Sequence, residues 1–436
     1  MAIFGRKKAP RRLLDPGEEP APTLPTPPDD NAEGLRPLNA HRDYILSLIE
    51  PLEPFGVQLQ EATGLMLCED IVPLSDLPTL DSAQITGYAV NSRDVARAEP
   101  GRTCTLNLVD REQSDPTVGS RQALYVAAGS VLPLGADCVV PLTYASESED
   151  GTAIVVRNRV IAGENVRRAG SDVSVGKTIL KSGQVLCDRH IGLLAGIGID
   201  KVLVRPRPRV VVIAIGAGLI DPSRPISSAD QFHDANSYMI SAAAQAAGAH
   251  TWRVAVDSED PDAVREAISD QLIRADLVIT TGGITPGGDS VVTQVMPQLG
   301  KCDFADVAIQ PGTHQGFGLI GDDEIPVIML PGDPVGVYMS FHAIVVPALR
   351  KLTASAPYLP DARRCFASTV LRSTEGVTHL IRGFYTEKGG RKLVRPVGHE
   401  QDHLLSSLAE ANCIICLDEN TTTVMAGDPV TIWPLA

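Results

Sequence analysis

The sequence lacks any run of about eighteen consecutive apolar residues, which is the length that a membrane-spanning helix needs. Its first residues likewise contain no apolar segment of the length found in signal peptides. The sequence therefore predicts a cytoplasmic protein with no transmembrane segment.

Positive charge is also in short supply, because 38 Lys and Arg residues are outnumbered by 53 Asp and Glu residues, giving a formal net charge of −15. An acidic surface repels phosphate groups, so no general nucleic-acid-binding function is expected. The apolar fraction of 44% is ordinary for a globular protein, and 436 residues are enough for about two to four domains, each with its own core.

The eight cysteines include no second close pair that would complete a zinc-finger pattern. Only Cys413 and Cys416 are close in sequence, and such a pair belongs either to a metal or redox site or to an apolar strand. The uninterrupted apolar segment 413–417 favours a strand in a protein core. Cysteines used in this way suit a reducing cytosol.

Proline, glycine and charged residues divide the chain into predicted regions. Residues 1–36 are rich in Pro, Glu and Asp after a basic cluster at 6–12, and they are predicted to form a disordered tail. The basic cluster either is simply solvated or contacts anionic lipid or an acidic partner. Residues 37–87 together with 161–205 are expected to form an N-terminal mixed helical domain. Residues 88–160 contain short alternating apolar runs and predict a β-rich domain.

Residues 206–353 alternate strand-like and helix-like segments, which predicts a doubly wound parallel α/β sheet. Apolar, β-branched runs predict four of its strands, at 209–215, 250–256, 275–281 and 325–330. Residues 360–436 return to short strands and predict a small C-terminal β-barrel or sandwich. The expected fold class is therefore a multidomain α/β protein with a doubly wound parallel domain, N-terminal β-rich and helical domains, and a C-terminal β-barrel.

Two loops that contain glycine follow predicted strands of this sheet, at the edge where doubly wound folds bind their ligands. One covers residues 280–289 and the other covers residues 330–335. The backbone amides of such a loop, with a helix N-terminus behind it, can hold an oxyanion such as phosphate; a tight turn is the simpler alternative. Neither loop matches the phosphate-binding P-loop or the dinucleotide-binding glycine pattern.

Two acids, Asp260 and Asp289, follow predicted strands and precede predicted helices. Each is suited to cap the helix that comes after it. Alternatively, a pair of carboxylates at this edge of the sheet can hold Mg²⁺, which prefers oxygen ligands.

Short motifs along the chain are similar, in content and in order, to those of one known enzyme family. Residues 81–90 read Asp-Ser-Ala-Gln-Ile-Thr-Gly-Tyr-Ala-Val, which is similar to the family motif Asp-Asn-Ser-Ala-Met-Asp-Gly-Tyr-Ala-Val, and residues 330–334 read Leu-Pro-Gly-Asp-Pro. Other segments with matching motifs lie at 59–70, 128–140, 163–167, 170–172, 281–283, 310–312 and 406–412. On these motifs the chain resembles the molybdopterin molybdenumtransferase family, and the resemblance extends over about residues 39–436 of the sequence.

This resemblance implies a homodimeric enzyme of molybdenum cofactor biosynthesis, in which the α/β domain binds molybdopterin. Its substrates would be adenylylated molybdopterin and molybdate, and its cofactor would be Mg²⁺. Asp260 and Asp289 would be the catalytic and metal-binding residues. The implied substrate-binding residues are Asn165, Arg167, Thr281, Gly282, Gly283, Thr285, Ser290, Pro331, Gly332, Asp333 and Pro334.

Several polar residues of the family motifs are replaced in this chain. Family acids correspond to Thr86, Thr143, Ala217, Gly218 and Ser290, family lysines to Gln310 and Thr313, and a family threonine to Ala128. An acid can hold Mg²⁺ or transfer a proton, and its replacements here cannot do so as anions. Two functions therefore remain open: molybdate insertion with weak or lost activity, which family membership favours, or a degenerate dimeric scaffold. The second would bind another protein, as the E domain of gephyrin in the same family anchors receptors.

Overall fold

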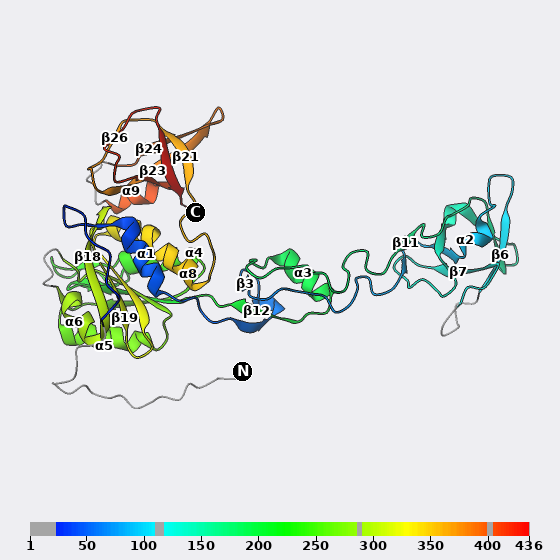
Figure 1. Cartoon of the computed structure of the whole chain (residues 1–436), viewed down its shortest axis with the longest axis horizontal. Helices are drawn as coiled ribbons and strands as arrows, with labels where there is room; N and C mark the ends of the chain where they lie inside the picture. The colour runs from blue at the N-terminus through cyan, green and yellow to red at the C-terminus, as the bar shows by residue number, and fades with distance from the viewer. Residues whose placement is uncertain (1–22, 110–116, 286–289, 399–403, 436) are drawn as a thin grey trace. The chain divides into compact units, whose positions relative to one another are not determined.

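The structure, a computed structural model, describes residues 23–109, 117–285, 290–398 and 404–435. They belong to two compact units (Figure 1). Unit 1 combines Met1–Glu53 with Pro206–Ala436, and unit 2 is the intervening segment Pro54–Arg205. None of the described helices combines the length and the apolar character that a membrane crossing requires.

Unit 1 is built on a sheet whose first four strands run parallel, as predicted. In sheet order they are β16 (His250–Val256), β13 (Arg209–Ile215), β17 (Leu277–Thr281) and β20 (Ile325–Leu330). Strand β13 is buried on both faces, because Val210 and Val212 belong to one apolar core and Val211 and Ile213 belong to another. A strand between two cores needs apolar residues at successive positions, which explains its continuous apolar run.

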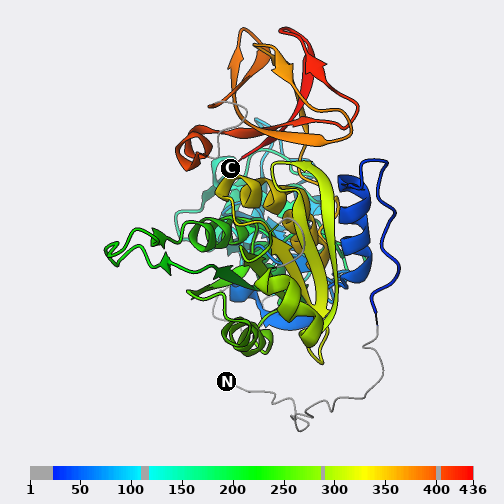
Figure 2. The same ribbon diagram turned by 90° about the vertical axis from the view of Figure 1, so that its left-hand side faces the viewer.

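Helices cover both faces of this sheet, which confirms the doubly wound arrangement. The first core is covered by α1 (Leu38–Leu48), α4 (Asn236–Ala246), α7 (Pro334–Ser340), a π-turn (Phe341–Val345) and α8 (Val346–Leu352). The second core lies against α5 (Pro261–Leu272) and α6 (Val291–Leu299). Figure 2 shows α1 as the blue helix of this unit.

The N-terminal boundary differs from the prediction. The segment 23–36 packs on unit 1 instead of forming a disordered tail: the hydroxyl of Tyr44 donates to the carbonyl oxygen of Pro25 at 2.8 Å. Strand β1 (Arg36–Pro37) then pairs with β18 (Gly300–Gln310). The apolar side chains of α1 are buried in the first core, so this helix belongs to unit 1 and not to the mixed domain. Segment-average composition misses such contacts, because a few side chains make them.

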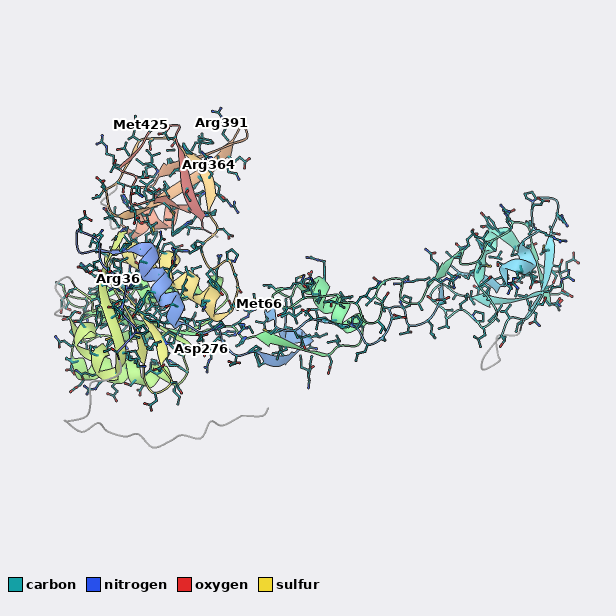
Figure 3. All side chains as sticks on the ribbon, viewed as in Figure 1. Arg36, Met66, Asp276, Arg364, Arg391 and Met425 are labelled. Atoms are coloured by element: carbon teal, nitrogen blue, oxygen red, sulfur yellow. The ribbon has the colours of Figure 1, made fainter. Side chains whose placement is uncertain are left out.

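The sheet continues from β20 into two antiparallel strands, β19 (His314–Ile320) and β18. Beyond them, the C-terminal region forms a closed five-stranded barrel, which confirms the predicted β-barrel. Its strands, in order, are β23 (Thr378–Lys388), β24 (Arg391–Pro396), β21 (Arg363–Ala367), β27 (Pro429–Pro434) and β25 (Cys413–Leu417), which pairs again with β23. Cys413 is fully buried on β25, as the strand interpretation requires. Figure 3 labels Arg364 and Arg391 on this barrel.

The remaining C-terminal elements are α9 (Leu405–Glu410) and the short pair β22 (Leu371–Arg372) and β26 (Thr423–Val424). Unit 2 contains the predicted β-rich region as one mixed sheet. Its strands, in order, are β8 (Cys138–Pro141), β5 (Gly87–Val90), β7 (Gln122–Val126), β6 (Cys104–Leu108), β10 (Ala153–Val156) and β9 (Ala145–Glu147).

A second part of unit 2 has its own small core. There β12 (Lys201–Arg205) lies between β2 (Phe55–Gln58) and β3 (Met66–Leu67), and α3 (Asp188–Gly196) contributes buried residues. Unit 2 also contains the pair β4 (Ser82–Ala83) and β11 (Val166–Arg167) and the short helix α2 (Ser92–Val95).

Candidate active site

A pocket of about 200 Å³ lies at the carboxyl end of the parallel strands in unit 1. Strand β13 ends there with Ala214 and Ile215, and β17 ends there with Thr281. The other walls contribute Gly282, Gly332, Pro334, Leu219, Phe232, His233, Asp234, Ala235 and Asn236. The pocket therefore occupies the edge that the order of strands and helices predicts for a ligand site.

Close backbone packing explains the glycine at position 282. Its φ is +81°, in the left-handed region, and a Cβ there would lie 2.3 Å from the carbonyl oxygen of Ile215. The N–H of Gly282 lies 3.3 Å from the carbonyl oxygens of Leu330 and Pro331. The two predicted glycine loops are thus bonded to each other, and the protein itself occupies the amide of Gly282.

Asn236, in the first turn of α4, joins the same two loops through its side chain. Its amide nitrogen donates to the hydroxyl oxygen of Thr281 at 2.9 Å and to the carbonyl oxygen of Gly332 at 2.7 Å. The hydroxyl of Thr281 donates in turn to the carbonyl oxygen of Pro331 at 2.9 Å. The amide oxygen of Asn236 is buried and has no hydrogen-bond partner among the described residues. One side chain therefore sets the spacing between the loops.

The start of α4 is ordered by Asp234, a buried carboxylate in the pocket lining. Asp234 accepts a hydrogen bond from the backbone N–H of Ser237 at 2.9 Å and a second one from the hydroxyl of Ser237. Carboxylates at a helix N-terminus satisfy backbone donors and interact favourably with the helix dipole. Asp234 therefore helps to hold the first turn of α4, and with it Asn236, against the pocket.

The outer wall of the pocket consists of two short parallel strands, β14 (Leu219–Ile220) and β15 (Phe232–His233). Leu219 and Phe232 line the pocket with apolar surface, and the side chain of Phe232 is about half exposed. Apolar walls with a few fixed polar groups are typical of sites for flat organic ligands.

Asp221 follows β14 and remains ionised at neutral pH. Hydrogen bonds from the hydroxyl and backbone N–H of Ser223, and from the hydroxyl of Tyr238, lower the pKa of Asp221 to about 2. The guanidinium carbon of Arg253 lies 3.3 Å from the centre of the Tyr238 ring, a cation–π contact. Since Tyr238 belongs to α4, these contacts connect the outer wall to that helix.

Of the predicted loop 331–334, Gly332 and Pro334 line the pocket. Asp333 caps α7, because its Oδ2 accepts from the backbone N–H of Gly336 at 2.6 Å. Pro331 contributes its carbonyl oxygen to the bonds with Gly282 and Thr281. These residues shape the site largely through the backbone.

Of the two predicted catalytic acids, Asp260 is described and is not among the residues that line the pocket. Asp260 caps α5: its Oδ2 accepts from the backbone N–H of Ala263 at 3.4 Å, and the side chain is exposed. Asp289 lies outside the described residues. Within the described part of the chain, no group of three or more His, Cys, Asp or Glu side chains is placed to hold a metal ion.

Three further predicted residues lie in the first loop or directly after it: Gly283, Thr285 and Ser290. Gly283 has φ +68°, and a Cβ there would lie 2.7 Å from Cγ2 of Val292. Thr285 is exposed. Ser290 begins α6, and its backbone N–H donates to the hydroxyl of Thr293 at 3.1 Å. All three lie between β17 and α6 in the chain, and none of them is among the residues that line the pocket.

The remaining predicted residues belong to unit 2. Asn165 has φ +58°, and its amide nitrogen donates to the carbonyl oxygen of Val139 at 2.9 Å. Arg167 forms an exposed ion pair with Asp172 at 3.3 Å. Thr86, in the motif at 81–90, accepts a hydrogen bond from the backbone N–H of Ala128 at 3.1 Å.

Sequence reasoning missed Asn236, Asp234 and the outer wall. Asp234 and Asn236 lie at the start of a helix-like segment that follows a strand of the sheet. Ligands of doubly wound folds bind at such positions, so this placement could have indicated the two residues. The wall has no comparable signal, because β14 and β15 are two residues long each.

Three protein-family models match successive regions of the chain. Family models match for the MoeA N-terminal region (domain I and II) at residues 36–198, the probable molybdopterin binding domain at 211–351, and the MoeA C-terminal region (domain IV) at 367–435. Molybdopterin molybdenumtransferase 1 of Mycobacterium tuberculosis is 34% identical over 413 residues, covering 88% of this chain and 95% of the relative. Molybdopterin molybdenumtransferase 2 of that organism is 31% identical over 420 residues, covering 92% and 100%.

The fold also matches a solved structure. The molybdopterin biosynthesis MoeA protein of Pyrococcus horikoshii superposes with a TM-score of 0.78, covering 92% of this chain and 99% of that chain at 23% identity. The sheet, its pocket and the accompanying domains thus define a multidomain protein of the MoeA fold.

The chain belongs to the molybdopterin molybdenumtransferase family, a family of transferases in molybdenum cofactor biosynthesis. The resemblance, the fold class and the functional class predicted from the sequence are confirmed. The comparisons give the scaffold alternative no support over the enzyme.

Proposed function

We propose that this chain inserts molybdate into adenylylated molybdopterin and that the pocket of unit 1 receives the pterin. The observation that carries this proposal is the position of the pocket. It lies at the carboxyl edge of the parallel sheet, and its lining comes from residues matched by the probable molybdopterin binding domain.

The lining suits a flat heterocycle. Ile215 and Phe232 offer apolar contact surface, while Asn236 and Thr281 bring polar side-chain atoms to the same pocket. Ser290, at the start of α6, and Thr285, in the loop after β17, are proposed to contact substrate phosphate, because a helix N-terminus favours an anion. Asn165 and Arg167 remain predicted substrate-binding residues.

The proposed cofactor is Mg²⁺, with Asp260 and Asp289 as its protein ligands. Mg²⁺ usually keeps several waters and is held by one or two carboxylates together with substrate phosphates, so a larger protein cluster is not required. Asp260 fits this role, because its exposed carboxylate accepts only a long capping bond of 3.4 Å among the described contacts. Bound Mg²⁺ would stabilise negative charge on phosphate oxygens.

We also propose that two copies of the chain form a homodimer. Unit 2 exposes large apolar side chains, including Leu74 at 96%, Leu134 at 76% and Ile161 at 65% of their area. Large apolar side chains lose their contact with water when they lie in a protein–protein interface, and the proposal assigns these three side chains to such an interface. Analytical ultracentrifugation would test this proposal: Leu134→Asp should shift the wild-type dimer toward monomer, and a monomeric wild-type protein would refute it.

The proposed compartment is the cytoplasm. All eight cysteines are free thiols, including the partly exposed Cys68 and Cys187. Free thiols persist in reducing compartments, where disulfides are rare. Fractionation of the source cells, with detection of the chain by antibody, would test this placement.

The activity can be tested on the purified full-length chain. It would be incubated with adenylylated molybdopterin, molybdate and Mg²⁺, and the product measured by reconstitution of a molybdenum-dependent apo-enzyme. Product that depends on molybdate is the expected result. Absence of pterin binding would overturn the proposed site, and pterin binding without turnover would overturn the proposed activity.

A further inference from the structure

A carboxylate outside the pocket lining holds the outer wall of the pocket. Asp257 follows β16, and its Oδ1 accepts a hydrogen bond from the backbone N–H of Gly218 at 2.7 Å. Gly218 lies in the turn between β13 and β14, and its carbonyl oxygen accepts from the N–H of Phe232 at 2.9 Å. Both Phe232 and Leu219, the residue after Gly218, line the pocket. Asp257 therefore holds Gly218 by one hydrogen bond, and Gly218 in turn bonds to Phe232 in the wall.

The turn at Gly218 depends on backbone contacts. Its φ is +83°, and a Cβ there would lie 2.2 Å from the carbonyl oxygen of Asp230, so position 218 is restricted to glycine. The N–H of Gly216 donates to the carbonyl oxygen of Val256 at 3.2 Å. Two hydrogen bonds, one to Val256 and one to Asp257, thus attach this turn to the end of β16.

We propose that Asp257 is a positioning residue of the pocket: its carboxylate holds the β13–β14 turn so that Leu219 and Phe232 contact one face of a flat heterocyclic ligand. The identity of that ligand as the pterin rests on the proposed function. A bond from an N–H to a carboxylate is stronger than one between neutral groups, and the wall pairs through only two residues of each strand. Loss of Asp257 should therefore weaken ligand binding and leave the chemical step intact.

Two substitutions separate the hydrogen bond from the charge. Asp257→Asn keeps an acceptor oxygen for the N–H of Gly218, and Asp257→Ala removes it. Asp428→Ala is a matched control, because Asp428 is an exposed acid of the barrel that accepts from the N–H of Met425 at 3.0 Å. For each full-length variant, molybdopterin affinity, kcat and KM for molybdate insertion, and hydrogen exchange of residues 216–233 would be measured.

Asp257→Ala should weaken molybdopterin binding about tenfold and raise KM, with kcat nearly unchanged. The amides of Gly218 and Phe232 should exchange faster. Asp257→Asn should restore most of the lost affinity and exchange protection, because its amide oxygen still accepts from the N–H of Gly218, and Asp428→Ala should leave both at the wild-type level. Wild-type exchange and affinity in Asp257→Ala would overturn the proposal, as would an Asp257→Asn variant as impaired as Asp257→Ala.

Failure of the proposed function has a different signature. In that case the wild-type chain itself does not bind molybdopterin. Hydrogen exchange of residues 216–233 then decides alone whether Asp257 holds the wall, because this measurement needs no ligand.

Discussion

The carbonyl oxygen of Ile215 lies so close to Gly282 that a side-chain Cβ on residue 282 would be 2.3 Å from it. This contact joins the ends of β13 and β17, two neighbouring strands that both end at the pocket. The shape of the pocket therefore depends on the absence of a side chain at one position. That dependence makes Gly282 the first residue to test.

Gly282→Ala should destabilise unit 1 by about 2 kcal/mol or more, because it combines a left-handed backbone with a collision. It should also abolish molybdopterin binding. Urea unfolding followed by tryptophan fluorescence reports on this unit, since both tryptophans, Trp252 and Trp433, belong to it. Gly248→Ala is the control: its φ is +93° with no atom within 4 Å of a Cβ, so only backbone strain of about 1 kcal/mol is expected. Equal losses in the two variants would contradict the packing argument.

Replacement of Asn236 tests the link between the two pocket loops. Asn236→Ala removes two hydrogen bonds and should cost about 1–3 kcal/mol of stability, together with most of the pterin affinity. Asn236→Asp should be more damaging, because a carboxylate oxygen would face the carbonyl oxygen of Gly332. Calorimetric titration with molybdopterin and urea unfolding would measure both effects. Asn420→Ala, at an exposed turn of the barrel, should leave affinity unchanged; wild-type affinity in Asn236→Ala would refute the assigned role.

His342 predicts a pH dependence of stability. It lies in the π-turn after α7, its Nε2 is buried without a partner among the described residues, and burial lowers its pKa to about 4. The unfolded chain, with a histidine pKa of about 6.5, takes up this proton first as the pH falls. Burial of neutral His342 therefore does not lower the free energy of unfolding above a pH of about 6.5. As the pH falls from about 6.5 to about 4, the free energy of unfolding decreases by up to about 3 kcal/mol, at about 1.4 kcal/mol per pH unit.

The substitution His342→Phe should flatten this dependence. Phenylalanine keeps a ring against Tyr338, whose ring centre is 4.6 Å from that of His342, and does not titrate. Urea unfolding at several pH values between 4.5 and 7.5 would show a smaller slope than in the wild type. Part of the slope should persist, because burial also lowers the pKa of His41, to about 3. An unchanged slope would show that His342 does not bind the proton; the exposed His250, changed to Gln, serves as control.

The ion pair of Arg36 and Asp303 anchors the N-terminal segment on β18. Arg36, labelled in Figure 3, is 5% exposed, and its guanidinium donates to both carboxylate oxygens of Asp303. Asp303→Asn removes the charge beside a buried cation and should destabilise unit 1 by about 3 kcal/mol. The exposed pair Arg265 and Asp262 provides the comparison, because Asp262→Asn should cost less than about 1 kcal/mol. Similar losses in urea unfolding for both variants would contradict this distinction between buried and exposed pairs.

Much of the sheet was predictable because its signals are local. Strand β13 is apolar at successive positions, and β20 was expected at the residues it occupies. Asp260 and Pro261 mark the start of α5, since aspartate caps a helix and proline suits its first turn. The same local rule left the role of Asp260 open, because a capping aspartate and a metal ligand look identical in sequence.

The candidate site was predictable only in part. The glycine loops were placed at the correct edge of the sheet, and Thr281, Gly282, Gly332 and Pro334 line the pocket. Their expected use was different: the amide of Gly282 bonds to the neighbouring loop. That bond joins the ends of two neighbouring strands, β17 and β20, and neither loop sequence indicates that these strands are neighbours.

By itself the sequence determined the family, the parallel strands and the edge of the sheet where the two glycine loops lie, because each depends on neighbouring residues or on short motifs. Only the tertiary structure decided that α1 packs in unit 1, that Asn236 joins two loops and that Asp257 holds the outer wall. The last two depend on hydrogen bonds between residues 96 and 39 positions apart. Such bonds form because packing of the whole sheet brings these groups together, and a local sequence pattern carries no information about residues so far apart in the chain.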